Sequence, residues 1–110
     1  MACWPRCSII VPVCNGENNI ADCLESLCGQ EYPADRFEII VVDNNSRDST
    51  AEVVRQYPVR YIQEEKPGSY AARNTGARLA RGDILAFTDA GCIADPNWLQ
   101  AISNALSDGE

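Results

Sequence analysis

Three apolar runs of β-strand length in this 110-residue chain are each followed by polar side chains that could bind a ligand; the runs cover residues 8–13, 39–42 and 84–87. Asp43 and Asp89 come directly after, or within two residues of, the second and third runs. The other polar residues at these points include Asn15, Glu17, Asn44, Asn45 and Asp48. Carboxylates that meet in one place repel each other unless a cation or a proton intervenes, so this pattern favours a divalent metal such as Mg²⁺ or Mn²⁺.

A structural interpretation of Asp43 and Asp89 is also open, because an Asp that follows a buried strand can cap the next helix. For one such residue on its own, the two interpretations are equally good. Two of them at the same edge of a sheet, among other polar residues, favour a binding site.

Arg73 stands just before a stripe of small residues, Thr75-Gly76-Ala77, in a predicted helix. Near the N-terminus of that helix, its guanidinium could bind a phosphate through two hydrogen bonds, with help from the helix dipole. The alternative is that Arg73 and Arg78 are solvated surface charges. Cys14 lies beside the predicted site, but the chain contains no histidine that could activate it as a nucleophile.

The spacing of apolar residues predicts four helices that would position these side chains, over residues 20–28, 50–57, 72–80 and 98–106. Gly29 is placed to end the first helix, and Ser49 and Glu52 have the spacing of a capping box for the second. Asp95 is the expected N-cap of the fourth, with a proline at the first helical position.

The strands complete a β-α-β-α-β-α-β-α order. The runs at 8–13, 39–42 and 84–87 are apolar throughout, as expected when helices cover both faces of a sheet. The run at 59–63 alternates, which suits an edge strand. We therefore expect one α/β domain over residues 1–110, a Rossmann-like three-layer sandwich with a mostly parallel sheet in the order 3-2-1-4.

In such a sheet the polar residues meet at one edge, because the carboxyl ends of parallel strands point the same way. A topological switch point lies between the first and fourth strands, and ligands of open α/β sheets bind there. Residues 63–68 are predicted to form a mobile loop over this edge.

The composition is that of an ordinary globular chain, with 45% hydrophobic and 23% charged residues. Its net charge of −7 argues against nucleic acid or an anionic membrane as a partner. A phosphate-bearing ligand would then need a bound cation, helix N-termini or local basic residues. No transmembrane-length apolar segment and no signal-peptide core are present, so the expected location is the cytoplasm, with a peripheral position at a membrane as a variant.

The six cysteines allow three interpretations. Disulfides are disfavoured without a secretion signal. A zinc site is disfavoured because its ligands are usually closely paired, whereas Cys23 and Cys28 are five residues apart and point in different directions on a helix. We therefore prefer cysteine as a small buried hydrophobe.

Four motifs resemble those of family-two glycosyltransferases. Residues 9–17, IIVPVCNGE, resemble the family's opening V-P-V-aromatic-N-x-E, and residues 41–50, VVDNNSRDST, resemble its second motif, V-D-D/N-x-S-x-D-x-T. Residues 67–76, PGSYAARNTG, resemble the G-x-x-x-A-R-N-x-G segment. Residues 87–92, FTDAGC, with DPNWL at 95–99, stand where the family carries its D-x-D metal motif and the helix after it.

This resemblance implies a nucleotide-diphospho-sugar transferase (GT-A) fold and the transfer of a sugar from a nucleotide-diphospho-sugar donor to an acceptor hydroxyl, with inversion. It implies that Asp43 and Asn44 recognise the base, and that Asp89 holds a Mg²⁺ or Mn²⁺ ion on the diphosphate. The acceptor, whether a saccharide, a lipid or another hydroxyl compound, is not specified. The donor-binding residues carried over by position are Pro12, Val13, Asn15, Glu17, Asp43, Asn44, Arg73 and Asp89.

Two departures from the family pattern matter. Cys14 replaces the usual aromatic residue, and Gly91 replaces the second Asp of D-x-D. A relaxed metal requirement and a non-catalytic relative are therefore both open.

No catalytic residue can be named either, because no candidate for the general base is evident. The chain is interpreted as the donor-binding half of the enzyme, truncated at its C-terminal side, with a nucleotide-sugar-binding module that transfers nothing as the alternative. An unrelated doubly wound redox domain is disfavoured, since the sequence has neither a Gly-rich dinucleotide fingerprint nor a C-x-x-C pair.

Overall fold

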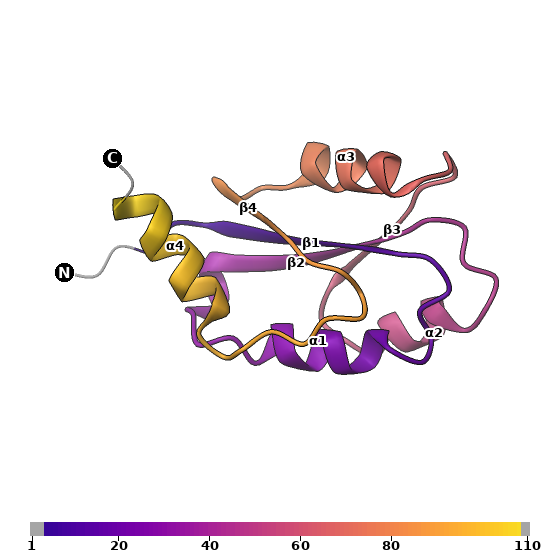
Figure 1. The fold of residues 1–110 in the computed structure, drawn as a ribbon, viewed down its shortest axis with the longest axis horizontal. Helices are drawn as coiled ribbons and strands as arrows, with labels where there is room; N and C mark the ends of the chain where they lie inside the picture. Colours follow the sequence, from indigo (N-terminus) through magenta and orange to yellow (C-terminus); the bar gives the residue numbers. More distant parts are fainter. Residues whose placement is uncertain (1–3, 109–110) are drawn as a thin grey trace.

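The computed structural model describes residues 4–108, and it contains one four-stranded parallel sheet in the order β3-β2-β1-β4. The strands are β1 (Cys7–Val13), β2 (Phe37–Asp43), β3 (Arg60–Gln63) and β4 (Ile84–Phe87). The α/β class and the strand order predicted from the sequence are confirmed. All four strands run in the same direction, away from the end of the molecule where the described residues begin and end (Figure 1).

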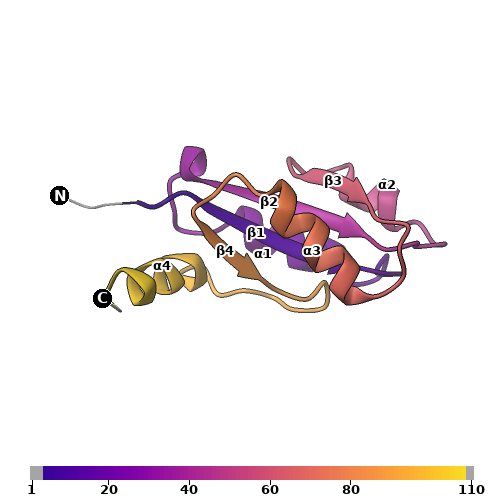
Figure 2. The ribbon, with the colours of Figure 1, turned by 90° about the horizontal axis from the view of Figure 1, so that it is seen from above.

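Helices cover both faces of this sheet (Figure 1). On one face lie α1 (Ile20–Cys28) and the short α2 (Thr50–Val54). On the other face α3 (Ser69–Leu79) crosses β1 and β2, as the view from above shows (Figure 2). The last helix, α4 (Trp98–Asp108), lies near the end of the molecule where β1 begins, and a single turn of 3₁₀ helix (Ala34–Arg36) precedes β2.

The larger core lies between the sheet and α1, where Ile9 and Val11 of β1 and Leu24 and Leu27 of α1 are all fully buried. On the opposite face α3 comes unusually close to the sheet, because a Cβ atom at Gly76 would lie only 2.5 Å from the Cγ2 atom of Ile10. Both faces of the central strand β1 are therefore covered, as its apolar sequence predicts.

The second helix is shorter than predicted. It ends at Val54. The residues after it form tighter 3₁₀-type turns, because the N–H groups of Gln56 and Tyr57 donate to carbonyls three residues earlier. The predicted capping box is also absent: Ser49 makes no side-chain cap, and the carboxylate of Asp48 accepts the Thr50 N–H instead at 3.0 Å.

One face of the fourth strand, β4, is exposed, whereas the sequence predicts that both faces are covered. Leu85 is 39% exposed and Phe87 is 44% exposed, although the apolar run predicts cover on both sides. The reason is the position of α3, which lies over β1 and β2 and leaves the outer strand β4 uncovered (Figure 2).

The five cysteines of the described residues are free and lie in two environments. Cys7 and Cys23 are buried, as predicted, and burial raises the pKa of Cys23 to about 11. Cys14, Cys28 and Cys92 are exposed, so the hydrophobic interpretation is wrong for these three. Cys3 lies outside the described residues.

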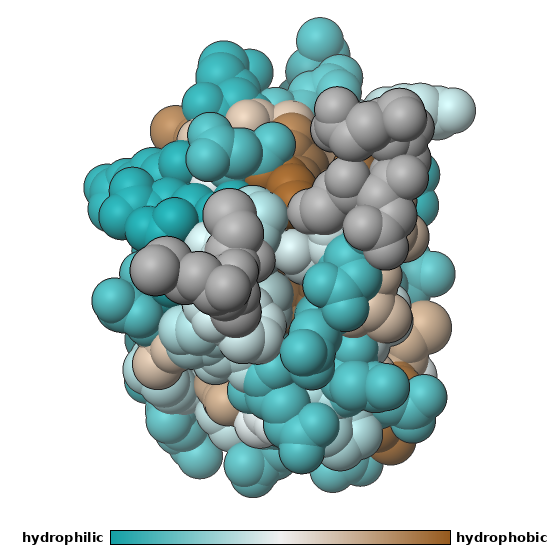
Figure 3. Space-filling view, turned by 90° about the vertical axis from the view of Figure 1, so that its left-hand side faces the viewer, coloured by the Kyte–Doolittle hydropathy of each residue, from teal (hydrophilic) through white to brown (hydrophobic). Residues whose placement is uncertain are grey.

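The surface at the end near α4 is mostly hydrophilic, with small hydrophobic areas (Figure 3). Within residues 4–108, no helix combines the length and the apolar character needed to cross a membrane.

Candidate functional site

A small cavity of about 140 Å³ lies where the ends of β1, β2 and β4 meet the start of α3, and we call it the tip pocket. It contains five of the eight predicted donor-binding residues. Its lining consists of Pro12, Val13, Cys14, Asn44, Ser69, Ala72, Arg73 and Asp89.

Parallel pairing brings these residues together from distant parts of the chain. Val13 at the end of β1 pairs with Asp43, which places Asn44 just beyond the sheet edge. On the other side of β1, Ile10 pairs with Phe87, so Asp89 follows two residues after β4. The tip pocket therefore lies beside the first and fourth strands, at the predicted switch point.

Arg73 and Asp89 face each other across this pocket. A guanidinium nitrogen of Arg73 lies 4.0 Å from a carboxylate oxygen of Asp89, and the side chains are 45% and 76% exposed, respectively. Such an exposed contact contributes little to stability, so both charges can be reoriented by a ligand at low cost.

Asn44 holds the segment 64–68 in place. Its amide nitrogen donates to the carbonyls of Glu64 at 2.9 Å and Lys66 at 2.7 Å, and its amide oxygen accepts the Gly68 N–H at 3.0 Å. Asn45 adds a hydrogen bond to the Glu65 carbonyl at 3.0 Å. The predicted mobile loop is thus a tethered segment, and one acceptor lone pair of Asn44 is left for a ligand.

Gly68, at the end of this segment, begins α3 with a φ of 109°. L-residues rarely adopt that conformation, so glycine is required for the turn that brings Ser69, Ala72 and Arg73 to the pocket.

Asn15 and Glu17 do not line the tip pocket. Their side-chain oxygens accept the N–H groups of Arg47 at 2.8 Å and Ser49 at 3.2 Å, in the loop after β2. In return, the hydroxyl of Ser46 accepts the Asn15 N–H at 2.8 Å. These two residues therefore fasten the loop after β1 to the loop after β2.

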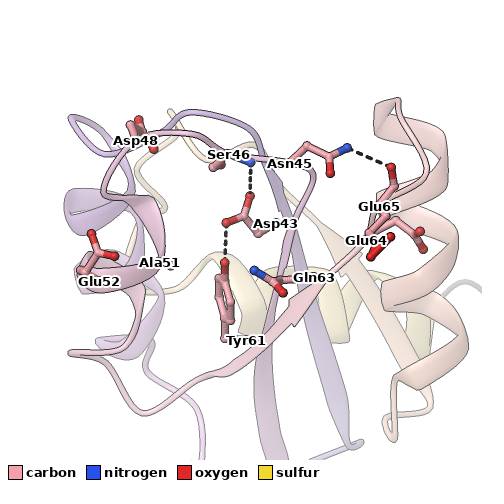
Figure 4. Close-up of a pocket in the computed structure, with 10 residues that line it drawn as sticks. All are labelled: Asp43, Asn45, Ser46, Asp48, Ala51, Glu52, Tyr61, Gln63, Glu64 and Glu65. Atoms are coloured by element: carbon pink, nitrogen blue, oxygen red, sulfur yellow. Dashed lines mark hydrogen bonds between the residues drawn. The ribbon is translucent and has the colours of Figure 1, made fainter.

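Asp43 is 3% exposed and points away from the tip pocket. One carboxylate oxygen accepts the Ser46 N–H at 3.0 Å, and the other accepts the hydroxyl of Tyr61 at 2.5 Å (Figure 4). Successive side chains of a strand alternate between faces, so Asp43 follows Val41 to the face of α1 and α2. Asp43 and Asp89 consequently line different pockets, and the prediction that they meet in one cleft is not met.

The pocket that Asp43 lines is larger, about 330 Å³, and strongly negative; we call it the acidic pocket (Figure 4). A hydrogen bond from Thr50 lowers the pKa of Asp48, and one from Thr75 lowers the pKa of Glu64, so both stay ionised at neutral pH. The acidic residues around it are Asp43, Asp48, Glu52, Glu64 and Glu65. The tip pocket differs in charge, because Arg73 there balances Asp89.

The residues present do not fit a resident divalent metal ion. Asp89 is the only acidic residue of the tip pocket, its carboxylate is already in contact with Arg73, and Gly91 offers no ligand. Within residues 4–108, no three His, Cys, Asp or Glu side chains are grouped so that they could hold a metal. Mg²⁺ and Mn²⁺ prefer several oxygen ligands, and a neighbouring guanidinium opposes a second cation.

Sequence reasoning did not identify Ser69 and Ala72 as pocket residues. Their signal is helical spacing, because residues 69, 72 and 73 share one face near the start of α3. The roles of all eight predicted residues in donor binding stay predictions; the structure establishes which of them line one cavity.

Comparison with known proteins agrees with this architecture. Residues 8–110 match the family described as Glycosyl transferase family 2. The chain is 44% identical over 109 residues to glycosyltransferase AglE of Haloferax volcanii, a match that covers 94% of this chain and 36% of AglE.

Two solved structures are similar in fold. One is TarS 1–349 of S. aureus in complex with UDP-GlcNAc, with a TM-score of 0.83 and 29% identity over 94% of this chain and 31% of that chain. The other is the mannosyltransferase PcManGT of Pyrobaculum calidifontis in complex with GDP-Man and Mn²⁺, with a TM-score of 0.82 and 32% identity over 94% of this chain and 32% of that chain.

The chain thus spans about a third of the length of these relatives. The family match nevertheless covers almost all of its own sequence, the strand order is the predicted one, and the tip pocket contains five of the eight motif residues. This chain belongs to glycosyl transferase family 2 and has the fold of GT-A glycosyltransferases.

Proposed function

We propose that this chain forms the donor-binding part of a glycosyltransferase that moves a sugar from a nucleotide-diphospho-sugar to an acceptor hydroxyl. The observation that carries the proposal is the tip pocket, where five predicted donor-binding residues from four separate segments line one cavity. The proposal is supported by TarS and PcManGT, which were each solved with a nucleotide sugar.

The tip pocket suits part of a donor rather than all of it. Its volume of about 140 Å³ is below the roughly 300–1,000 Å³ of most small-molecule sites. In this proposal Arg73 binds phosphate oxygens, and the remaining acceptor lone pair of Asn44 accepts an N–H group of the base.

The reaction proposed is a direct displacement with inversion. The acceptor oxygen bonds to the anomeric carbon while the bond from that carbon to the phosphate oxygen breaks and its electron pair stays on the departing diphosphate. The proton of the acceptor hydroxyl passes to a general base. Because Asp89 is already paired with Arg73, the proposal assigns this base to a part of the enzyme other than residues 4–108.

Calorimetric titration of the chain with UDP, GDP and dTDP sugars tests the proposal. We expect at least one of them to bind, and Ser69→Glu to weaken that binding by about tenfold or more, since it places a carboxylate beside the diphosphate. A glutamate suits the start of a helix, so this variant should fold.

Asn104→Glu is the matched control, because it adds the same charge at an exposed position of α4 outside the tip pocket. Absence of binding by every donor, or equal effects of the two variants, would contradict the proposal.

A nucleotide-sugar-binding module that transfers nothing is the second candidate, favoured by the absence of an assigned base among residues 4–108. The two are separated by measuring the release of nucleoside diphosphate. Donor binding without any release, in the presence of varied acceptors, favours the module, and release that depends on the acceptor favours the enzyme.

A further inference from the structure

The negative charge of the donor must be offset if it is to bind in the tip pocket. A nucleoside diphosphate is a multiply charged anion, while the chain carries a net charge of −7 and the neighbouring acidic pocket holds five carboxylates. In proteins that bind such ligands, a divalent cation or basic side chains usually offset the phosphate charge. The tip pocket offers only one of these, the guanidinium of Arg73.

The position of Arg73 suits that task. It lies in the second turn of α3, and its guanidinium is 45% exposed and within 4.0 Å of Asp89. Asp89 is therefore a weak, exposed partner of the guanidinium, which stays free to turn towards a ligand in the pocket. A planar guanidinium can bind two phosphate oxygens at once, whereas an ammonium acts as a point charge.

The start of α3 adds to this positive potential. Its N-cap residue is Gly68, no side chain caps the helix, and Ser69 lines the tip pocket. The first N–H groups of the helix and its dipole thus favour an anion in the tip pocket, beside the guanidinium of Arg73.

Position 91 is where a second metal ligand would be needed, and glycine stands there. An added Cβ atom at Gly91 would meet no atom within 4 Å, and its backbone is not in the left-handed region. A carboxylate would therefore fit, so neither packing nor backbone geometry explains the glycine.

We propose that Arg73 takes the place of the divalent cation in this chain, so that the nucleoside diphosphate binds without a metal ion. This inference rests on the proposed function, since it concerns how the same pocket binds the donor. Asp89 then contacts Arg73 and is not a metal ligand.

Calorimetric titration with UDP and GDP, in EDTA and again in excess Mn²⁺, tests the inference directly. We expect the dissociation constant of the unmodified chain to change by less than about twofold between the two conditions. Arg73→Ala should weaken binding by about tenfold to a hundredfold, because hydrogen bonds to a charged group are lost. Arg73→Lys should retain only part of the affinity of the unmodified chain, since lysine keeps the positive charge but cannot bind two phosphate oxygens with a planar guanidinium.

Arg78→Ala is the matched control. Arg78 is an exposed arginine of the same helix that lines a different cavity, so its removal should leave nucleotide affinity unchanged. An equal loss in both arginine variants would show a general charge effect and overturn the role of Arg73.

Gly91→Asp provides the converse experiment. It supplies the missing carboxylate, so we expect Mn²⁺ to strengthen UDP or GDP binding by about tenfold in this variant, while Gly91→Asn, equal in shape but uncharged, should show no such gain. A Mn²⁺ gain in both variants, or in neither, would overturn the assignment of position 91.

Binding by the unmodified chain that disappears in EDTA and returns with Mn²⁺ would overturn this inference and leave the proposed function intact. Absence of nucleotide binding in both conditions would overturn the proposed function and this inference with it.

Discussion

At the scale of single residues, the strand tips show how one side chain can be bound by its own protein instead of a ligand. Asp43 is buried, and hydrogen bonds from Ser46 and Tyr61 occupy both of its oxygens. Tyr61 also lies beneath the guanidinium of Arg55, whose carbon is 5.5 Å from the ring centroid. Asp43 therefore joins β2, β3 and the loop before α2.

Replacement of Tyr61 by Phe tests this role. The change removes one hydrogen bond to a buried carboxylate, so we expect the free energy of unfolding to fall by about 1–3 kcal/mol in urea titrations at neutral pH. Tyr70→Phe is the control, because Tyr70 is 78% exposed. Equal stability of the two variants would show that the Tyr61 hydroxyl is not needed.

The sequence locates Asn15, Glu17 and Asp43 at the strand tips correctly, but it does not reveal what they bind. A polar side chain at the end of a strand can bind a ligand or an N–H group of a neighbouring loop, and both tasks call for the same residue types. The difference depends on the face to which each side chain points and on the path of the second loop. Those depend on the tertiary structure, which motif spacing does not contain.

At the scale of helices and strands, the agreement is closest where the periodic signal is long. The helix at residues 20–28 occurs with the predicted ends, because five apolar positions and a following glycine specify it. The helix at 50–57 stops early, because 3₁₀ turns replace its last turn before Pro58. The prediction that helices cover both faces of β4 is wrong, since an apolar run does not indicate which helix, if any, lies over each face.

The contact of α3 with the sheet gives a prediction at this scale. Gly76→Ala would place a methyl group 2.5 Å from Ile10 and 3.2 Å from Val42, so either α3 or these buried side chains must shift. We expect a loss of about 1–3 kcal/mol in unfolding free energy, in spite of the better helix propensity of alanine. Gly91→Ala, which meets no neighbour, should be nearly neutral, and a neutral Gly76→Ala would contradict the close approach.

Glu38 of β2 links β1, β3 and the turn after α3, and its contribution to stability depends on pH. Its carboxylate accepts hydrogen bonds from Ser8 at 2.6 Å, the Arg81 N–H at 2.7 Å and Arg60 at 2.9 Å. Burial raises the pKa of Glu38, but these hydrogen bonds outweigh burial and leave it below the ordinary value of 4.5.

A carboxyl group whose pKa is lowered by folding stabilises the fold when the pH is above its unfolded value. That contribution is lost as the pH falls through the folded value. We therefore expect Glu38→Gln to cost roughly 1–3 kcal/mol at neutral pH, and the difference from the unmodified chain to shrink as the pH drops below 4.5. Urea titrations across this pH range measure the difference in unfolding free energy between the two proteins. A difference that grows as the pH falls would contradict the stabilising role of the ionised Glu38.

At the scale of the whole molecule, the sheet has an open edge. Within the described residues, β4 pairs only with β1, so its other edge is unpaired, and Leu85 and Phe87 are exposed on the face of β4 that α3 leaves uncovered. An open apolar edge strand is a template for pairing with another chain.

We expect the isolated 110-residue chain to self-associate as its concentration rises, and the double variant Leu85→Lys with Phe87→Lys to reduce this. Sedimentation velocity over a range of concentrations measures the effect. Leu106→Lys is the control, because Leu106 is 57% exposed on α4 and outside the sheet. Self-association that is unchanged in the double variant would locate the contact elsewhere.

The fastening of residues 14–17 to the loop after β2 has a consequence for engineering. Each loop supplies both donors and acceptors to the other, across some thirty positions of sequence. A transplant of only one of them from a homologue would leave unmatched amides and carboxylates in its counterpart. We therefore expect the two loops to be exchangeable only together, as a single cassette.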